Sequence, residues 1–156
     1  MLSAAWALLL LAFQAVQQAH GKAVFAHFMV TNSENYISSD WETDMTLAKN
    51  SRIDAFERDP TNYHSLEMAF VAANTVGFKL FFSFDYAGNG PWDQDEVIAL
   101  IQKYGSNNAY FQHNSQPFVS TFEGPNNAND WIGIKQRPTV FSCQTGHLWV
   151  PSQLWR

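Results

Sequence analysis

Two carboxylates in this sequence stand where they could act together on a sugar. Asp85 and Glu123 each follow directly on a run of apolar and β-forming residues, and Tyr86 and Trp92 lie close to Asp85 along the chain. Cleavage of a glycosidic bond requires an acid for the leaving oxygen, a base or nucleophile for the anomeric carbon, and flat rings for the sugar's C–H face. Asp85 and Glu123 are therefore candidate catalytic residues, although carboxylates at strand ends equally cap helices or pair with lysines.

His27 and Asp54 occupy comparable positions in two earlier apolar segments. A histidine at such a place is more often a hydrogen-bonded residue of the protein interior than a ligand. Asp54 is expected to have a structural role.

The segments that must position these residues alternate between strand and helix patterns. Short apolar runs predict strands over residues 23–30, 52–56, 78–84 and 118–122. Three motifs predict where helices start. They are a capping box of Ser39 and Glu42, an N-cap with a first-turn proline at Asp59-Pro60, and a repeat of the cap pattern at Asp93 and Glu96. Apolar stripes follow these starts, one of them through Tyr63, and Gly77 is expected to end its helix in a left-handed turn.

Four strand-plus-helix units fit into residues 22–135. Repeated βα units imply a parallel sheet, and eight of them close a barrel of about 250 residues. No glycine-rich phosphate loop follows the first strand, which disfavours a dinucleotide-binding sheet. The predicted fold class is therefore α/β, a partial (β/α)8 TIM-type barrel of about four βα units, with chemistry where strands end and βα loops begin.

Composition excludes several other classes of protein. The 156 residues carry a formal net charge of −5 and show no basic stripe, so a nucleic-acid partner is not expected. Cys143 is the only cysteine in the sequence, which rules out an internal disulfide framework and a Cys-clustered metal site.

The first twenty-one residues have the pattern of a secretory signal peptide. Residues 4–13 form an unbroken apolar run, and Ala19 and Gly21 place small residues before a cut at Lys22. The run is too short to cross a bilayer, which needs roughly 20 apolar residues. We therefore expect a signal peptide at 1–21, a secreted protein of the extracellular space or cell wall, and no membrane partner after cleavage.

Four blocks of the sequence, taken together, resemble a known family. The blocks Lys22–Val30, Ile53–Phe56, Gly77–Tyr86 and Pro117–Gly124 are similar, in this order, to successive blocks of glycoside hydrolase family 71, the fungal α-1,3-glucanases or mutanases. The resemblance implies a (β/α)8 barrel and a secreted hydrolase of the glucan endo-1,3-alpha-glucosidase type. Its polysaccharide partner would be cell-wall α-1,3-glucan, and no metal or organic cofactor is implied. The residues that the resemblance assigns to the substrate-binding cleft wall are His27, Asp85, Tyr86, Trp92 and Glu123.

The sequence also departs from the family pattern. The family's catalytic carboxylates lie in a later Trp-Asn-Asp-x-Gly-Glu-Ser block, and this sequence contains no such block. The second strand runs directly into residues 57–60 and is expected to lose its carboxyl end. Residues 136–156 have no visible family counterpart and predict an irregular, unmatched tail after a barrel half of residues 22–135. These departures predict a truncated product, with an uncovered apolar inner face, that is unstable and inactive alone; a diverged short product is the competing interpretation.

Three other interpretations remain open at this stage. The chain could bind glucan without cleaving it, with Tyr86, Trp92 and Trp131 as sugar platforms. Asp85 and Glu123 could be its own acid and base. Signal cleavage after Ala19 would instead expose an N-terminal histidine as a copper ligand, but enzymes of that kind resemble β-sandwiches rather than alternating βα chains.

Overall fold

A computed structural model describes residues 23–58 and 62–137 of the chain. The expected signal peptide at 1–21, the expected helix start at Asp59-Pro60, and residues 138–156 of the expected tail lie outside the described residues.

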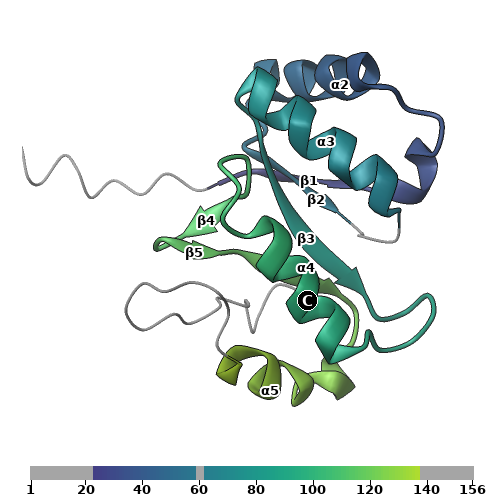
Figure 1. Cartoon of the computed structure of the whole chain (residues 1–156), viewed down its shortest axis with the longest axis vertical. Helices are drawn as coiled ribbons and strands as arrows, with labels where there is room; N and C mark the ends of the chain where they lie inside the picture. The colour runs from purple at the N-terminus through teal and green to yellow at the C-terminus, as the bar shows by residue number, and fades with distance from the viewer. Residues whose placement is uncertain (1–22, 59–61, 138–156) are drawn as a thin grey trace, which may run out of the picture.

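The centre of the described structure is a parallel sheet of four strands in the order β1-β2-β3-β6 (Figure 1). Its strands are β1 (Phe25–Phe28), β2 (Ala55–Arg58), β3 (Lys79–Asp85) and β6 (Val119–Phe122). In the register, Phe28 lies opposite Arg58, which in turn lies opposite Phe82 of β3. The expected parallel α/β arrangement is confirmed, while closure into a barrel stays a prediction.

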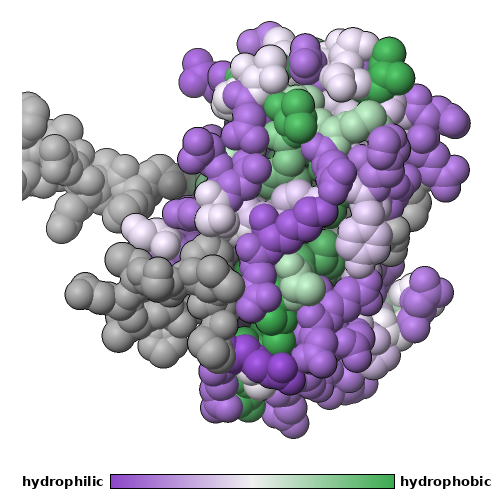
Figure 2. All heavy atoms as spheres, viewed as in Figure 1, coloured by the Kyte–Doolittle hydropathy of each residue, from purple (hydrophilic) through white to green (hydrophobic). Residues whose placement is uncertain are grey.

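Helices follow the strands in sequence and cover one face of this sheet (Figure 1). They are α2 (Ser38–Asn50), α3 (Tyr63–Val76), α4 (Gln94–Tyr104) and α5 (Asp130–Gln136), with short 3-10 turns η1 (Val30–Ser33) and η2 (Pro125–Asn127). Phe82 of β3 packs against Phe70 of α3 at a ring-centroid distance of 6.1 Å. The outward side of the helical layer in the view of Figure 2 is mainly hydrophilic, as expected for amphipathic helices.

The opposite face of the sheet is concave and holds a cluster of phenylalanine rings. The ring centroid of Phe25 in β1 lies 4.9 Å from that of Phe81 in β3 and 5.5 Å from that of Phe118, which precedes β6. Because β1 and β6 are not neighbours in the sheet, this contact requires strong curvature. Phe81 is 1% exposed and Phe118 is 4% exposed. The prediction of an uncovered apolar inner face is therefore wrong for this part of the sheet, since the rings cover one another.

A small hairpin that the sequence pattern did not predict completes the aromatic cluster. Strands β4 (Gln112–His113) and β5 (Gln116–Pro117) are antiparallel. Asn114 and Ser115 join them with φ of 51° and 62°, as in a two-residue turn with both central residues left-handed. The preceding Phe111 donates its backbone N–H to the Leu80 carbonyl at 2.7 Å, which places its ring beside Phe81.

Strand β2 lies further along the chain than expected. It begins at Ala55 and continues through Arg58, which lies opposite Phe82, three residues before the end of β3. The loss of its carboxyl end stays a prediction, since residues 59–61 lie outside the described residues. The residues before it are used otherwise: the Ile53 N–H bonds to the Ala48 carbonyl at 3.0 Å, and Asp54 Oδ2 accepts the Val24 N–H at 2.7 Å. Asp54 therefore precedes β2 instead of ending a strand, and its role is structural.

Helix α2 begins two residues earlier than the predicted capping box requires, since its N-cap is Ile37. Its first residue is Ser38, and the Asp40 carboxylate accepts the backbone N–H of Ile37 at 3.0 Å. The prediction of Ser39 and Glu42 as a box is wrong because the N-cap is Ile37, and the third helical residue, Asp40, binds the N-cap N–H instead of Glu42. By contrast, Gly77 adopts the expected left-handed conformation after α3, with φ of 66°.

Replacement of Asn62 by alanine is expected to lower the free energy of unfolding by about 1 kcal/mol. Asn62 is the N-cap of α3, and its side-chain oxygen accepts the Ser65 N–H at 3.1 Å. Urea denaturation measures the change, and Asn62→Asp, which retains a capping oxygen, is the control. Equal losses in both variants would contradict a capping role.

Candidate functional site

Asp85 and Glu123 lie at the same edge of the sheet, where its strands have their carboxyl ends. Asp85 is the last residue of β3, and its register partner Phe122 is the last residue of β6. The Tyr86 N–H donates to the Phe122 carbonyl at 3.0 Å and ties the two strand ends together. The sequence-based prediction that both carboxylates follow neighbouring strands of one sheet is confirmed, and we call this region the carboxyl edge.

The carboxylate of Asp85 shapes the loop that follows it. Its Oδ1 accepts the backbone N–H groups of Ala87 at 2.7 Å and Gly88 at 3.2 Å. The side chain is half-buried. Asp85 therefore holds the turn after β3 through one oxygen. Its carboxylate still has lone pairs that can accept hydrogen bonds from further donors.

Glu123 stands in an unusual backbone conformation. Its φ is 58°, and that of the following Gly124 is 84°, so two successive residues are left-handed. A residue other than glycine pays a steric penalty of roughly 1 kcal/mol or more in this region. The turn holds the Glu123 side chain exposed at the carboxyl edge, and such strain is often retained where a side chain must be aimed.

His27 lies on the concave side of the sheet near the same edge. It occupies the third position of β1 and is exposed. Its ring centroid is 6.2 Å from that of Phe122, across the curved sheet. Phe122 itself is 39% exposed. The structure thus brings His27 to the end of β6 and adds Phe122, an aromatic ring that sequence reasoning counted only as part of a strand.

Two buried hydroxyl groups lie on the same concave side. Ser83 of β3 and Ser120 of β6 are register partners that are 2% and 8% exposed, and strand alternation places them on the face of Phe81. Among the described residues, neither Oγ has a hydrogen-bond partner. Buried hydroxyls are rarely left without a partner, so these two mark a polar position beneath the carboxyl edge. No sequence pattern predicted this polar position, because the two serines are small residues within otherwise apolar strands.

Tyr86 and Trp131, expected as sugar platforms, are instead part of the core. Tyr86 is 7% exposed and Trp131 is 6% exposed, and their ring centroids are 6.5 Å apart. Burial, followed by the charge of Asp130, raises the pKa of Tyr86 to about 12. Gly124 crosses the Tyr86 ring so closely that a Cβ there would lie 2.7 Å from Cγ. Neither ring offers an open face to a sugar in this structure.

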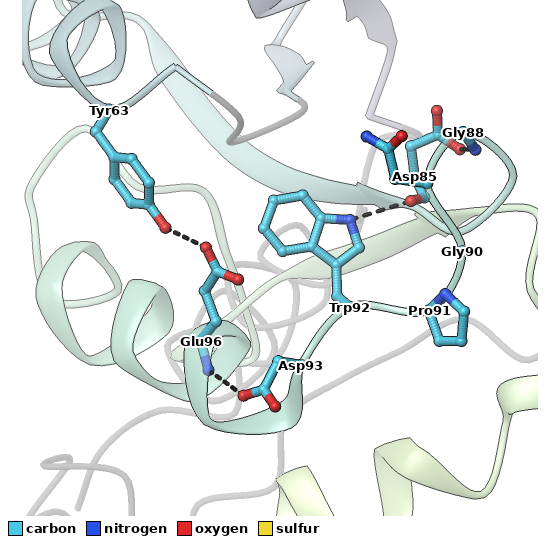
Figure 3. Close-up of a pocket in the computed structure, with 9 residues that line it drawn as sticks. Tyr63, Asp85, Gly88, Gly90, Pro91, Trp92, Asp93 and Glu96 are labelled. Atoms are coloured by element: carbon cyan, nitrogen blue, oxygen red, sulfur yellow. Dashed lines mark hydrogen bonds between the residues drawn. The ribbon is translucent and has the colours of Figure 1, made fainter.

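Trp92 lies on the other side of the carboxyl edge, in the helical layer. Its Nε1–H donates to the Asp85 carbonyl at 3.0 Å, and its ring meets the edge of Phe84 at 5.2 Å. It lines a pocket of about 290 Å³ between the β3–α4 loop and the first turns of α3 and α4 (Figure 3). The pocket's residues are Tyr63, Asp85, Gly88, Asn89, Gly90, Pro91, Trp92, Asp93 and Glu96.

Tyr63 and Glu96 meet in this pocket, which the sequence did not predict. Tyr63 was expected on the buried stripe of its helix, but it is 47% exposed and donates its hydroxyl to Glu96 Oε1 (Figure 3). This hydrogen bond, with some burial, raises the pKa of Tyr63 to about 12. Glu96 was expected to complete a capping box with Asp93. Asp93 does cap α4, through the N–H groups of Asp95 and Glu96, but the Glu96 side chain turns to Tyr63.

The described residues show neither a metal-binding cluster nor a membrane-spanning helix. In residues 23–58 and 62–137, no three side chains of His, Cys, Asp or Glu are grouped so that they could hold a metal ion. Over the same ranges, no helix has both the length and the apolar character required to cross a bilayer.

The chain belongs to glycosyl hydrolase family 71, whose sequence model matches residues 20–152. The match continues beyond Lys135, where the resemblance was expected to stop. Two relatives are informative. The chain is 36% identical over 124 residues to the mutanase Pc12g07500 of Penicillium rubens, covering 76% of this chain and 27% of that protein. It is 34% identical over 109 residues to the glucan endo-1,3-alpha-glucosidase agn1 of Schizosaccharomyces pombe, covering 66% and 26%. The chain thus spans about a quarter of the length of these relatives.

Proposed function

We propose that this chain forms one wall of the substrate cleft of a secreted hydrolase of the glucan endo-1,3-alpha-glucosidase type, acting on cell-wall α-1,3-glucan. The observation that carries the proposal is the family match over residues 20–152, together with the names of the two relatives. The proposed signal peptide at 1–21 would direct the protein out of the cell, and the curved parallel sheet would be part of a (β/α)8 barrel.

The carboxyl edge supplies the groups that such a wall needs. Asp85 and Glu123 accept hydrogen bonds from sugar hydroxyls, and the His27 imidazole can donate or accept. The exposed ring of Phe122 lies on the same edge and offers an apolar surface to the C–H face of a glucosyl unit. Phe122 therefore takes the platform role that the sequence assigned to Tyr86.

Binding without cleavage is the behaviour we propose for the 156-residue chain on its own. Glycosidases place two carboxyl groups on either side of the scissile bond, about 5–5.5 Å apart for retention and about 6.5–9.5 Å apart for inversion. In this chain, one Asp85 oxygen is committed to two backbone N–H groups, and the sequence lacks the Trp-Asn-Asp-x-Gly-Glu-Ser block. Asp85 and Glu123 are accordingly substrate-binding residues here.

Replacement of Glu123 by glutamine is expected to weaken binding to insoluble α-1,3-glucan by about tenfold. A hydrogen bond to a charged acceptor contributes about 1–2 kcal/mol more than one to a neutral amide, and 1.4 kcal/mol corresponds to a factor of ten. A depletion assay on α-1,3-glucan, with cellulose as the comparison polymer, measures the change. Glu42→Gln on α2, in the helical layer, is the matched control and should bind like the parent chain.

The same samples test the absence of hydrolysis. Release of reducing ends from α-1,3-glucan, lost in both Asp85→Asn and Glu123→Gln, would overturn the non-catalytic part of the proposal and make these two residues the acid and base. Equal retention of the parent chain on α-1,3-glucan and cellulose, or on neither polymer, would overturn the cleft-wall assignment.

A further inference from the structure

The pocket around Trp92 is separate from the concave face, although Asp85 lies next to both. The indole packs on Phe84, whose ring is on the helix-facing side of β3 with Trp131 at a centroid distance of 6.0 Å. Tyr63 and Glu96 line it from the first turns of α3 and α4. The pocket therefore lies on the helix-facing side of β3, whereas His27 and Phe122 of the cleft wall assigned above lie on the concave side.

Two carboxylates of the pocket, those of Asp93 and Glu96, are hydrogen-bond acceptors at the N-terminus of a helix. Asp93 Oδ1 accepts the N–H groups of Asp95 at 2.9 Å and Glu96 at 3.2 Å, at the N-terminus of α4. Glu96 lies in the first turn of that helix and accepts the Tyr63 hydroxyl. A helix N-terminus favours negative charge, so these carboxylates do not require a bound cation, yet each can accept further hydrogen bonds.

The apolar groups of the pocket are flat and lie beside these acceptors. Trp92 is half-buried and held in place by its Nε1–H bond to the Asp85 carbonyl, and Pro91 lies next to it. The volume of about 290 Å³ is just below the usual range for ligand pockets, about 300–1,000 Å³, and fits a single small ring. Flat apolar surface next to carboxylate acceptors suits a ring with a C–H face and several hydroxyl donors.

We propose that this pocket binds one neutral glucosyl unit of an α-linked glucan outside the substrate cleft. The site would hold the polymer at the outer side of the carboxyl edge while the cleft wall contacts another part of it. The inference rests on the proposed function for the identity of the sugar, and on the pocket itself for the location.

Titration of the isotope-labelled full chain with soluble α-1,3-linked glucose trimers tests the site by nuclear magnetic resonance. The chain has six tryptophans, and Trp92→Phe identifies the indole N–H signal of Trp92 by its loss. We expect this signal to shift on titration. Glu96→Gln should weaken the apparent affinity read at Trp92 by roughly fivefold, since a charged acceptor becomes neutral. Glu42→Gln, on α2, should leave that affinity unchanged, and Glu123→Gln should alter the carboxyl-edge signals but not the Trp92 titration.

The outcomes separate this inference from the proposed function. Shifts at Phe122 and Glu123 without any shift at Trp92 would overturn the pocket assignment and leave the cleft wall standing. A Trp92 shift without shifts at the carboxyl edge would support the pocket and count against the cleft wall. An unchanged Trp92 titration in Glu96→Gln, with the backbone spectrum intact, would also overturn the pocket assignment. An equal response to a β-1,4-linked trimer would remove the α-linked specificity.

Discussion

Replacement of Phe81 by alanine is expected to lower the free energy of unfolding by about 3–5 kcal/mol. Phe81 is 1% exposed, and its ring centroid lies 4.9 Å from those of both Phe25 and Phe118. Removal of the ring would leave a cavity between the first and fourth strands of a curved sheet that cannot easily collapse. Because domains of this kind are stable by only about 5–15 kcal/mol, the variant would be close to unfolding at ambient temperature.

Urea denaturation followed by far-ultraviolet circular dichroism measures this loss. Phe122→Ala is the matched control, since this substitution removes the same kind of ring from a position that is 39% exposed. It should lower the free energy of unfolding by less than about 1 kcal/mol. Similar costs for the two variants would show that the concave aromatic cluster does not form as described.

Replacement of Gly124 by alanine is expected to cost about 2–4 kcal/mol, combining about 1–3 kcal/mol for overpacking with about 1 kcal/mol for the backbone. Gly124 has φ of 84°, and an added Cβ would lie 2.7 Å from Cγ, 2.8 Å from Cβ and 2.9 Å from Cδ1 of Tyr86. The Tyr86 ring is enclosed by Trp131 and cannot move aside without opening the core.

Gly90→Ala separates the clash from the backbone strain. Gly90 has nearly the same φ, 85°, but a Cβ there would meet nothing within 4 Å. Thermal unfolding of both variants should therefore show a much smaller decrease in midpoint for Gly90→Ala. Equal decreases would mean that strain alone, and no contact with Tyr86, explains the need for glycine at residue 124.

Local chemistry allowed much of the fold to be predicted. The run of bulky apolar residues that ends at Asp85 predicts a buried strand, and the structure has β3 at this position. Gly77 and Asp93 act through groups a few residues away, so their roles at helix ends follow from sequence spacing alone. The same locality explains why Asp85 and Glu123 could be placed at one edge, since each directly follows its own strand.

Three of the failures involve contacts between residues distant in sequence. The burial of Tyr86 could not be predicted, because the residues that cover it, Gly124 and Trp131, lie roughly forty residues later in the chain. The shift of β2 follows from Asp54 binding the Val24 N–H, thirty residues earlier. Tyr63 meets Glu96 only because two helices begin side by side. Each of these depends on packing that no local pattern encodes.

The contact between Phe25 and Phe118 also bears on how the molecule is made. The two rings meet at 5.5 Å although roughly ninety residues separate them in the chain. Forming such non-local pairs requires closure of a long loop, and parallel sheets with many of them fold slowly. During synthesis, the Phe25 ring of the first strand would therefore lack this contact until the segment that carries Phe118 and the fourth strand had left the ribosome.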